Sequence, residues 1–228
     1  MAESSLLYYI TDRTAFAPDE PTRRSRLLKK IAEAARANVD YIQIREKDLS
    51  ARELESLARD AVRIVGKLRT ENRQLRTRLL INSRTDIALS VSADGVHLRS
   101  DDISPEDVHG IWRKVYAGTA EFPQRHALND QPVIGVSCHK PEEVAAAKTS
   151  GARFAVFAPV FEKKGVPDTL PAGLAQLCEA CKIDIPVLAL GGITLANSSS
   201  CFEAGAAGIA AIRLFQENNI AEIVDSLH

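Results

Sequence analysis

Eight apolar segments recur along the chain and constrain its fold more than any other feature. They are rich in β-branched or aromatic residues, and they start near Leu6, Val39, Arg78, Gly95, Val133, Arg153, Pro186 and Gly208. Their nearly continuous apolar character indicates strands that are covered on both faces, which implies parallel pairing. Between most of them lies a segment whose apolar residues have helical spacing.

Helix start signals stand between these strands. Ser50 opens a capping box, Ser104 precedes a proline at the first helical position, and Thr194 is placed to cap a later helix. The segment 66–77 reads instead as a long basic and polar connection. Eight strands and about eight helices in 228 residues predict a single-domain (β/α)8 TIM barrel over residues 1–228 rather than an open sheet.

Composition narrows the classes of function. Hydrophobic residues make up 45% of the chain and charged residues 26%, as in an ordinary soluble globular protein. A net charge of -1 gives no field that would attract nucleic acid or an acidic membrane. The N-terminal segment lacks the layout of a signal peptide, and no apolar run approaches about 18 residues, so we expect a cytoplasmic protein with neither partner. The CxxC pair Cys178 and Cys181 favours reduced thiols over a zinc or redox site, because no second pair of ligands is evident.

Polar side chains follow the carboxyl ends of nearly all the predicted strands. In a barrel these ends surround one mouth, where the active site lies. In strand order the residues are Thr11, Asp12 and Arg13, then Gln43, Arg45 and Lys47, then Asn82, Ser83 and Arg84, then Arg99, Asp101 and Asp102, then Ser137 and His139, then Lys163 and Lys164, then Gly191 and Gly192, and finally Arg213. Such convergence predicts a small-molecule enzyme site.

Two of these groups indicate phosphate binding. Arg45 and Lys47 share a parity at the end of a strand, so both cations point the same way and suit an anion. Gly191 and Gly192 follow the seventh strand, where backbone amides and a helix N-terminus form the usual phosphate site of such barrels. The expected ligand is therefore a phosphorylated small molecule.

Seven short segments resemble, in the same order, the thiamine phosphate synthase family, which includes thiazole tautomerase-like relatives. They are residues 9–13, 43–48, 80–84, 94–98, 135–139, 158–161 and 190–194, so the resemblance spans nearly the whole chain. The resemblance implies a (β/α)8 barrel that joins hydroxymethylpyrimidine diphosphate to a thiazole phosphate and releases diphosphate. Because the bond to diphosphate breaks early, such chemistry needs Mg²⁺ and fixed cations to stabilise the leaving group.

The same resemblance assigns roles to single residues. It implies contacts to the pyrimidine diphosphate from Gln43, Arg45, Lys47, Asn82 and Ser137, and contacts to the thiazole phosphate from Gly191, Gly192, Ile212 and Arg213. Lys163, in the loop after the sixth strand, is a further substrate-binding candidate. Asp102 matches a magnesium ligand, and Ser83 stands where the family has a second metal-binding aspartate. Arg45, Lys47 and His139 are the catalytic candidates.

Three positions depart from the family pattern. Ser83 is a poorer Mg²⁺ ligand than a carboxylate, and the segment that it opens reads as a helix-capping box. The threonine-rich loop after the sixth strand is replaced by residues 162–167, in which Lys163 or Lys164 would contact phosphate at a different spacing. Arg213 replaces a serine, and arginine binds phosphate in another geometry.

These departures leave three functions open. Lys47 and Asp102 favour the synthase. Ser83 and the altered loop favour a tautomerase, whose proton transfer on a thiazole phosphate would use His139 in place of a metal. The third alternative is a non-catalytic protein that binds thiamine-pathway phosphates. The sequence does not fix the oligomeric state, and the resemblance is compatible with a homodimer.

Overall fold

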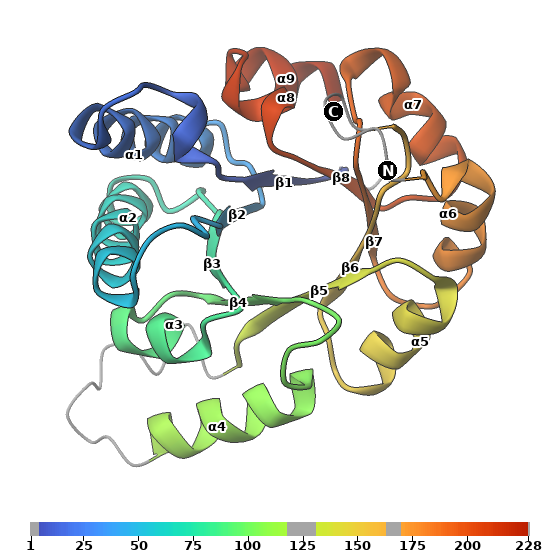
Figure 1. The fold of residues 1–228 in the computed structure, drawn as a ribbon, viewed down its shortest axis with the longest axis horizontal. Coiled ribbons are helices and arrows are strands. Elements are labelled where there is room, and N and C mark those ends of the chain that lie inside the picture. The colour runs from blue at the N-terminus through green and yellow to red at the C-terminus, as the bar shows by residue number, and fades with distance from the viewer. Residues whose placement is uncertain (1–4, 118–130, 163–169, 228) are drawn as a thin grey trace.

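Eight parallel strands close into a barrel, with each strand bonded to the next in chain order and β8 bonded to β1 (Figure 1). A computed structural model of the protein describes residues 5–117, 131–162 and 170–227. The strands are β1 (Leu6–Ile10), β2 (Tyr41–Ile44), β3 (Arg78–Asn82), β4 (Gly95–Leu98), β5 (Val133–Cys138), β6 (Phe154–Phe157), β7 (Val187–Leu190) and β8 (Gly208–Ala211). The predicted (β/α)8 barrel is confirmed.

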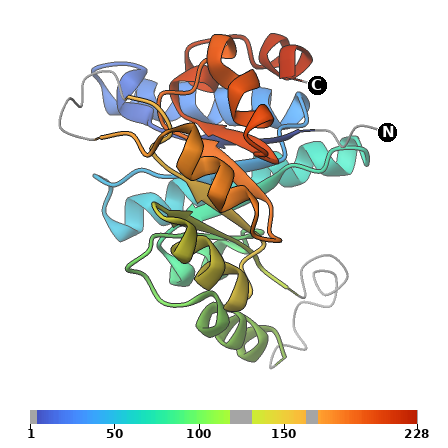
Figure 2. The same ribbon diagram turned by 90° about the vertical axis from the view of Figure 1, so that its right-hand side faces the viewer.

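Helices form a layer around the strands, which Figure 1 shows along the barrel and Figure 2 from the side. In the described residues they are α1 (Glu20–Arg36), α2 (Ala51–Glu71), α3 (Thr85–Val91), α4 (Pro105–Ala117), α5 (Pro141–Thr149), α6 (Gly173–Cys181), α7 (Leu195–Glu203), α8 (Arg213–Gln216) and α9 (Ile220–Leu227), with the 3-10 turn η1 (Arg13–Ala15). None of the helices in these residues is long and apolar enough to cross a membrane.

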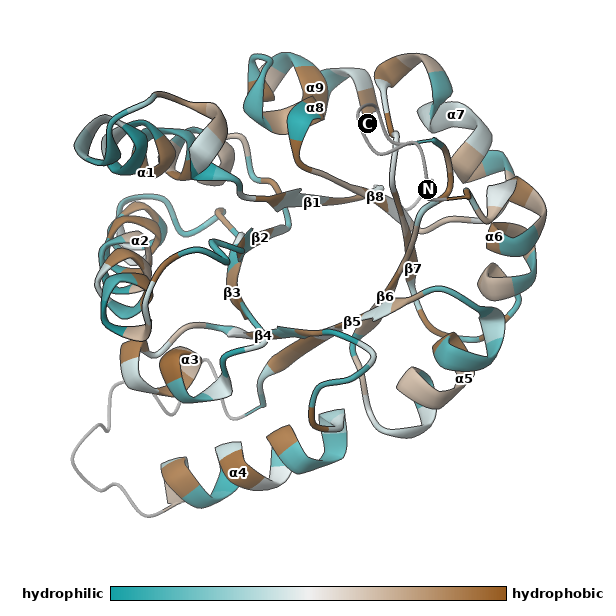
Figure 3. Cartoon of the chain, viewed as in Figure 1, coloured by the Kyte–Doolittle hydropathy of each residue, from teal (hydrophilic) through white to brown (hydrophobic). Residues whose placement is uncertain are grey.

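The alternation of side chains along each strand divides the core into two clusters. Tyr8 and Ile10 of β1 lie inside the barrel with Leu80 and Phe154, whereas Leu7 and Tyr9 belong to the larger cluster between strands and helices. This is the period of two expected for a strand buried on both faces. In Figure 3 the strands are mostly hydrophobic, while the helices carry hydrophobic and hydrophilic residues together. Parity therefore decides which strand residues can reach the barrel mouth.

The helix start signals are confirmed. Ser50 N donates to Glu53 Oε2 at 2.9 Å, and Glu53 N donates back to Ser50 Oγ at 3.3 Å. Ser104 Oγ accepts from the third residue of α4 at 3.1 Å, and Thr194 is the N-cap of α7. The expected connection over 66–77 is wrong in its first half, because α2 continues to Glu71. Leu68 there packs against the core and extends the apolar face of the helix.

Candidate active site

The ends of β2 and β3 meet at the barrel mouth through their amide side chains. Gln43 shares the inward parity of Tyr41 and is buried, and its Nε2 donates to Asn82 Oδ1 at 3.2 Å. Asn82 Nδ2 in turn donates to Ser83 Oγ at 3.1 Å. Three predicted site residues are therefore connected in one hydrogen-bonded row.

The ends of β4 and β5 meet through a buried histidine. His97 alternates with apolar neighbours, which predicts a core residue, and it is indeed 3% exposed. Its Nε2 lies 2.8 Å from Ser137 Oγ. Burial, with a smaller contribution from the charge of Arg45, lowers the pKa of His97 to about 3, although Asp102 opposes the shift. His97 is therefore neutral at working pH, and Arg45 and Asp102 both lie within electrostatic range of it.

The two predicted metal ligands have different surroundings. Asp102 is largely buried, with its side chain 13% exposed, and its Oδ2 accepts from Arg99 N at 2.7 Å. Ser83 has a left-handed backbone, with φ of +57°, and its N–H donates to the His97 carbonyl at 2.8 Å. The capping role predicted for Ser83 is wrong, because the N-cap of α3 is Arg84 and no side chain caps that helix. The described residues contain no group of three acidic, histidine or cysteine side chains that could hold a metal ion by themselves.

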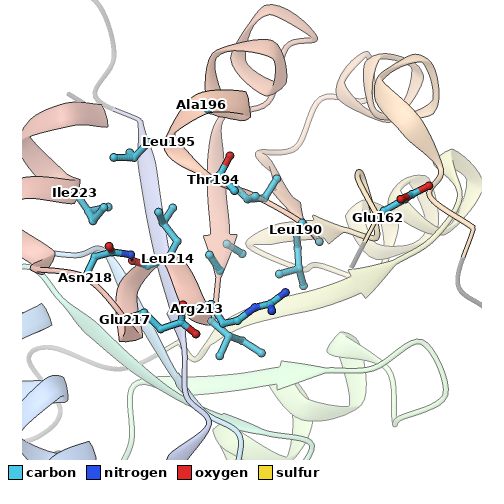
Figure 4. A pocket seen from close by; sticks show the side chains of 16 residues that line it. Glu162, Leu190, Thr194, Leu195, Ala196, Arg213, Leu214, Glu217, Asn218 and Ile223 are labelled. Carbon is cyan, nitrogen blue, oxygen red and sulfur yellow. The ribbon is translucent and has the colours of Figure 1, made fainter. Parts of the chain in front are cut away.

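A cavity of about 840 Å³ lies at the ends of β7 and β8. It is lined by Gly191, Gly192, Ile212 and Arg213, four residues that the sequence predicts for the thiazole phosphate. In Figure 4 the exposed Arg213 side chain extends from the start of α8 among the lining residues. Gly192 has φ of +66°, and a Cβ there would lie 2.4 Å from the carbonyl oxygen of Glu162. Only glycine allows the two backbones to approach this closely.

Other predicted site residues stand apart from these contacts. His139 is exposed, and its Nδ1 lies 2.7 Å from the carbonyl oxygen of Ala158, so that nitrogen carries the proton and Nε2 is left as an acceptor. Lys47 is exposed one position beyond Glu46. Lys163 and Lys164 lie outside the described residues.

Two residues expected at the mouth face the other way. Thr11 shares the outward parity of Tyr9, Arg13 opens the 3-10 turn η1, and both are buried. They contact the buried Glu46, with Thr11 Oγ1 donating to its Oε1 at 2.5 Å and Arg13 N to its Oε2 at 3.0 Å. The expectation that both residues line the mouth is wrong, because it counted strand ends without following side-chain parity.

Several lining residues carry no signal in the sequence. The cavity beside Arg213 is also formed by Leu190, Thr194, Leu195, Glu217, Asn218 and Ile223. Glu217 and Asn218 lie just after the short helix α8, where no motif marks them. The outward orientation of Thr11 could have been found, since it shares the parity of Tyr9, but its contact with Glu46 could not.

A closed barrel with cations after β2 and a glycine-lined, arginine-containing cavity after β7 and β8 has the architecture of a phosphate-handling (β/α)8 enzyme. A family model described as "Thiamine monophosphate synthase" matches residues 7–215. The chain belongs to this family.

Relatives and a solved structure agree with this assignment. The chain is 36% identical to a thiamine-phosphate synthase of Syntrophomonas wolfei, over 90% of this chain and 86% of the relative. It is 34% identical to a thiamine-phosphate synthase of Clostridium novyi, over 93% and 91% of the two chains. The solved thiamine phosphate pyrophosphorylase of Pyrococcus furiosus is similar with a TM-score of 0.72 and 26% identity, over 97% of this chain and 93% of that chain.

Proposed function

We propose that this chain is a thiamine phosphate synthase, which joins hydroxymethylpyrimidine diphosphate to a thiazole phosphate and releases diphosphate. Membership of the family supports the reaction. The observation that carries the proposal is the division of the mouth into two anion-binding halves. One half contains Arg45, two positions after Gln43 of the Gln43–Asn82 pair, and the other is the cavity of Gly192 and Arg213.

The half at β2 suits the departing diphosphate. As the bond from the pyrimidine methylene carbon to the diphosphate oxygen breaks, its electron pair stays on that oxygen and negative charge builds there. Arg45 and Lys47, two positions apart after the end of β2, would stabilise this charge. No described carboxylate forms an ion pair with the Arg45 guanidinium. The positive charge of Arg45 is therefore available to an anionic ligand.

The hydrogen-bonded groups beside these cations suit the pyrimidine. Gln43 and Asn82 present amide groups, and Ser137 presents a hydroxyl held by the neutral His97. Such groups form directional bonds to ring nitrogens and an exocyclic amine, and they carry no charge that would oppose a pyrimidine-stabilised cation. We assign Gln43, Asn82 and Ser137 to recognition and orientation of this ring.

The half at β7 and β8 suits the thiazole phosphate. Gly191 and Gly192 let the loop after β7 pack closely against residues 159–162, and the following helix α7 offers its N-terminal amides to a phosphate. Arg213 supplies a cation with two parallel N–H groups at the place of the family's serine. A phosphate held here would fix the thiazole so that its ring nitrogen can donate its electron pair to the pyrimidine methylene carbon.

The donors at the mouth fit Mg²⁺ that binds together with the diphosphate. Mg²⁺ is often held by one or two carboxylates plus substrate phosphates and water, so Asp102 can serve as its carboxylate and Ser83 as a weak neutral ligand. When bound, the ion would add positive charge to the leaving group. Asp102 is the single carboxylate predicted as a metal ligand. We therefore expect Asp102→Asn to raise the Mg²⁺ concentration for half-maximal rate by at least about tenfold.

The direct test is turnover by the purified chain with both substrates and Mg²⁺. We expect thiamine phosphate and diphosphate in equal amounts, and absence of product at every Mg²⁺ concentration would refute the proposal. The variant His139→Ala distinguishes a synthase from the alternative tautomerase. A tautomerase would act on its thiazole substrate without metal and lose that activity in the variant, and a pure binder would show phosphate affinity with neither activity.

A further inference from the structure

Arg13 lies at the centre of a charge cluster on the outer side of the barrel wall, behind the proposed diphosphate half. Its Nη1 donates to Asp48 Oδ1 at 2.6 Å and to Glu46 Oε2 at 3.3 Å. Its Nε donates to Glu20 Oε1 at 2.8 Å. The side chains of Arg13 and Glu46 are only 4% and 1% exposed. One buried guanidinium therefore binds three carboxylates.

Thr11 connects this cluster to the backbone that carries the catalytic cations. Thr11 Oγ1 donates to Glu46 Oε1 at 2.5 Å and accepts from Arg45 N at 3.0 Å. Thr11 N also donates to the carbonyl oxygen of Gln43 at 3.0 Å. The hydrogen bonds thus run without a break from Arg13 through Glu46 and Thr11 to the Arg45 amide, and they fix the end of β2.

The acids of the segment lie apart from Arg45. Glu46 and Asp48 both bind Arg13, whereas Arg45 follows Gln43 by two positions at the end of β2 and shares its parity. A buried carboxylate that loses its cation is strongly destabilising and attracts whichever cation can reach it. For Glu46, the cation of the adjacent residue is Arg45.

Electrostatic effects agree with this arrangement. The hydrogen bond to Asp48 raises the pKa of the Arg13 guanidinium, although burial opposes it, so Arg13 stays charged. Burial raises the pKa of Glu46, and the bonds from Thr11 and Arg13 counteract that rise. Without Arg13, Glu46 would be a desolvated carboxyl beside the anion-binding half.

We propose that Arg13 is a positioning residue for the diphosphate half, which binds the carboxylates of Glu46 and Asp48 and so leaves the charge of Arg45 directed at the ligand. The identity of that ligand rests on the proposed function. Arg13 does not touch substrate itself, because it is buried and its Nε and Nη1 groups are bonded to carboxylates. Its effect passes through the segment 45–48.

The test is the binding of inorganic diphosphate to full-length Arg13→Gln, measured by calorimetry with and without Mg²⁺. We expect the Kd to rise by roughly tenfold or more, with the KM for the thiazole phosphate within about twofold of wild type. The matched control is Arg24→Gln, which removes another arginine from an ion pair, the 2.7 Å contact of Arg24 with Asp60. The control makes the same change in net charge, and its diphosphate Kd should not move.

The double variant Arg13→Gln with Glu46→Gln distinguishes positioning from direct contact. Removing the buried carboxylate together with its cation leaves no desolvated anion next to Arg45, and the remaining partners Asp48 and Glu20 are exposed to water, so the Kd should return to within about threefold of wild type. The proposal is overturned if Arg13→Gln binds diphosphate as wild type does. It is equally overturned if the double variant stays as weak as the single one, since Arg13 would then act on the ligand directly.

A variant that tests the same connection without removing a buried charge is available at Thr11. Should Arg13→Gln not fold, Thr11→Val is expected to weaken diphosphate binding and Thr11→Ser to restore it, and equal binding by both overturns the proposal. Binding without turnover also separates this inference from the proposed function. If wild type binds diphosphate with these shifts but makes no thiamine phosphate, only the proposed function fails, whereas wild type that binds no diphosphate overturns the inference.

Discussion

Along residues 45–48 the acids and Arg45 have different tasks. Arg45 shares the inward parity of Gln43 at the end of β2, and the two acids are bound by Arg13. The sequence alone predicts this inward parity, because the position of β2 is clear from its apolar run. The outer contacts required the relative placement of β1 and β2, which no local pattern contains.

His97 provides a prediction for the pH dependence of stability. Its folded pKa of about 3 lies below the ordinary value of 6.5, so the unfolded chain takes up this proton first as the pH falls. The free energy of unfolding should therefore fall by about 3 kcal/mol between pH 6.5 and pH 4 because of this one group. Well above pH 6.5 the imidazole is neutral in both the folded and the unfolded state, so His97 no longer changes the free energy of unfolding as the pH varies.

The measurement is chemical denaturation of wild type and His97→Gln across this pH range. The variant lacks the titrating group but keeps a neutral polar side chain near Ser137, so its stability should fall less steeply on acidification. The contributions of the other titrating groups, which both proteins share, cancel in the difference between the two stability profiles. Parallel pH profiles for the two proteins would show that His97 is not buried in its neutral form.

At the scale of elements, the loop after β7 depends on a glycine that no other residue can replace. Gly192→Ala would place a Cβ 2.4 Å from Glu162 O and 2.9 Å from Phe161 Cβ. We expect a loss of at least about 2 kcal/mol of stability and a higher KM for the thiazole phosphate. Both follow from displacement of the loop that forms the cavity.

Gly173→Ala is the matched control for that substitution. Gly173 has a similar φ of +79°, but a Cβ there would meet nothing within 4 Å. Denaturation of this variant should show only the backbone cost of about 1 kcal/mol, with the thiazole phosphate KM unchanged. Equal effects of the two substitutions on KM would contradict the role given to the β7 loop.

At the scale of the whole molecule, barrel closure depends on the seam between β8 and β1. Leu6 pairs with Gly208, and a Cβ on Gly208 would lie 2.0 Å from the Leu6 carbonyl oxygen. Gly208→Ala should cost several kcal/mol in denaturation experiments, because the two backbones must separate. Gly66→Ala in α2, where a Cβ meets nothing within 4 Å, should instead stabilise the protein by about 0.5–1 kcal/mol. A Gly208→Ala variant as stable as wild type would argue against this closed register.

The sequence predicts the whole architecture better than it predicts the site. Strand positions and caps follow from local patterns, and the closed barrel follows from their number. The cavity residues Glu217 and Asn218 could not be predicted, because they depend on how α8 and α9 turn over the end of β8. The inward facing of Arg13 was wrongly expected for the same reason, since it depends on contacts between separate strands.

We propose that the barrel mouth binds the pyrimidine diphosphate and the thiazole phosphate in separate halves. The most direct measurement is the steady-state KM of both substrates for Arg45→Gln and Arg213→Gln, with thiamine phosphate as the detected product. We predict that Arg45→Gln raises the KM for the pyrimidine diphosphate by at least about tenfold and that Arg213→Gln does so for the thiazole phosphate, each with little effect on the other substrate. The account would be contradicted if both variants raised the same KM, or if wild type formed no thiamine phosphate.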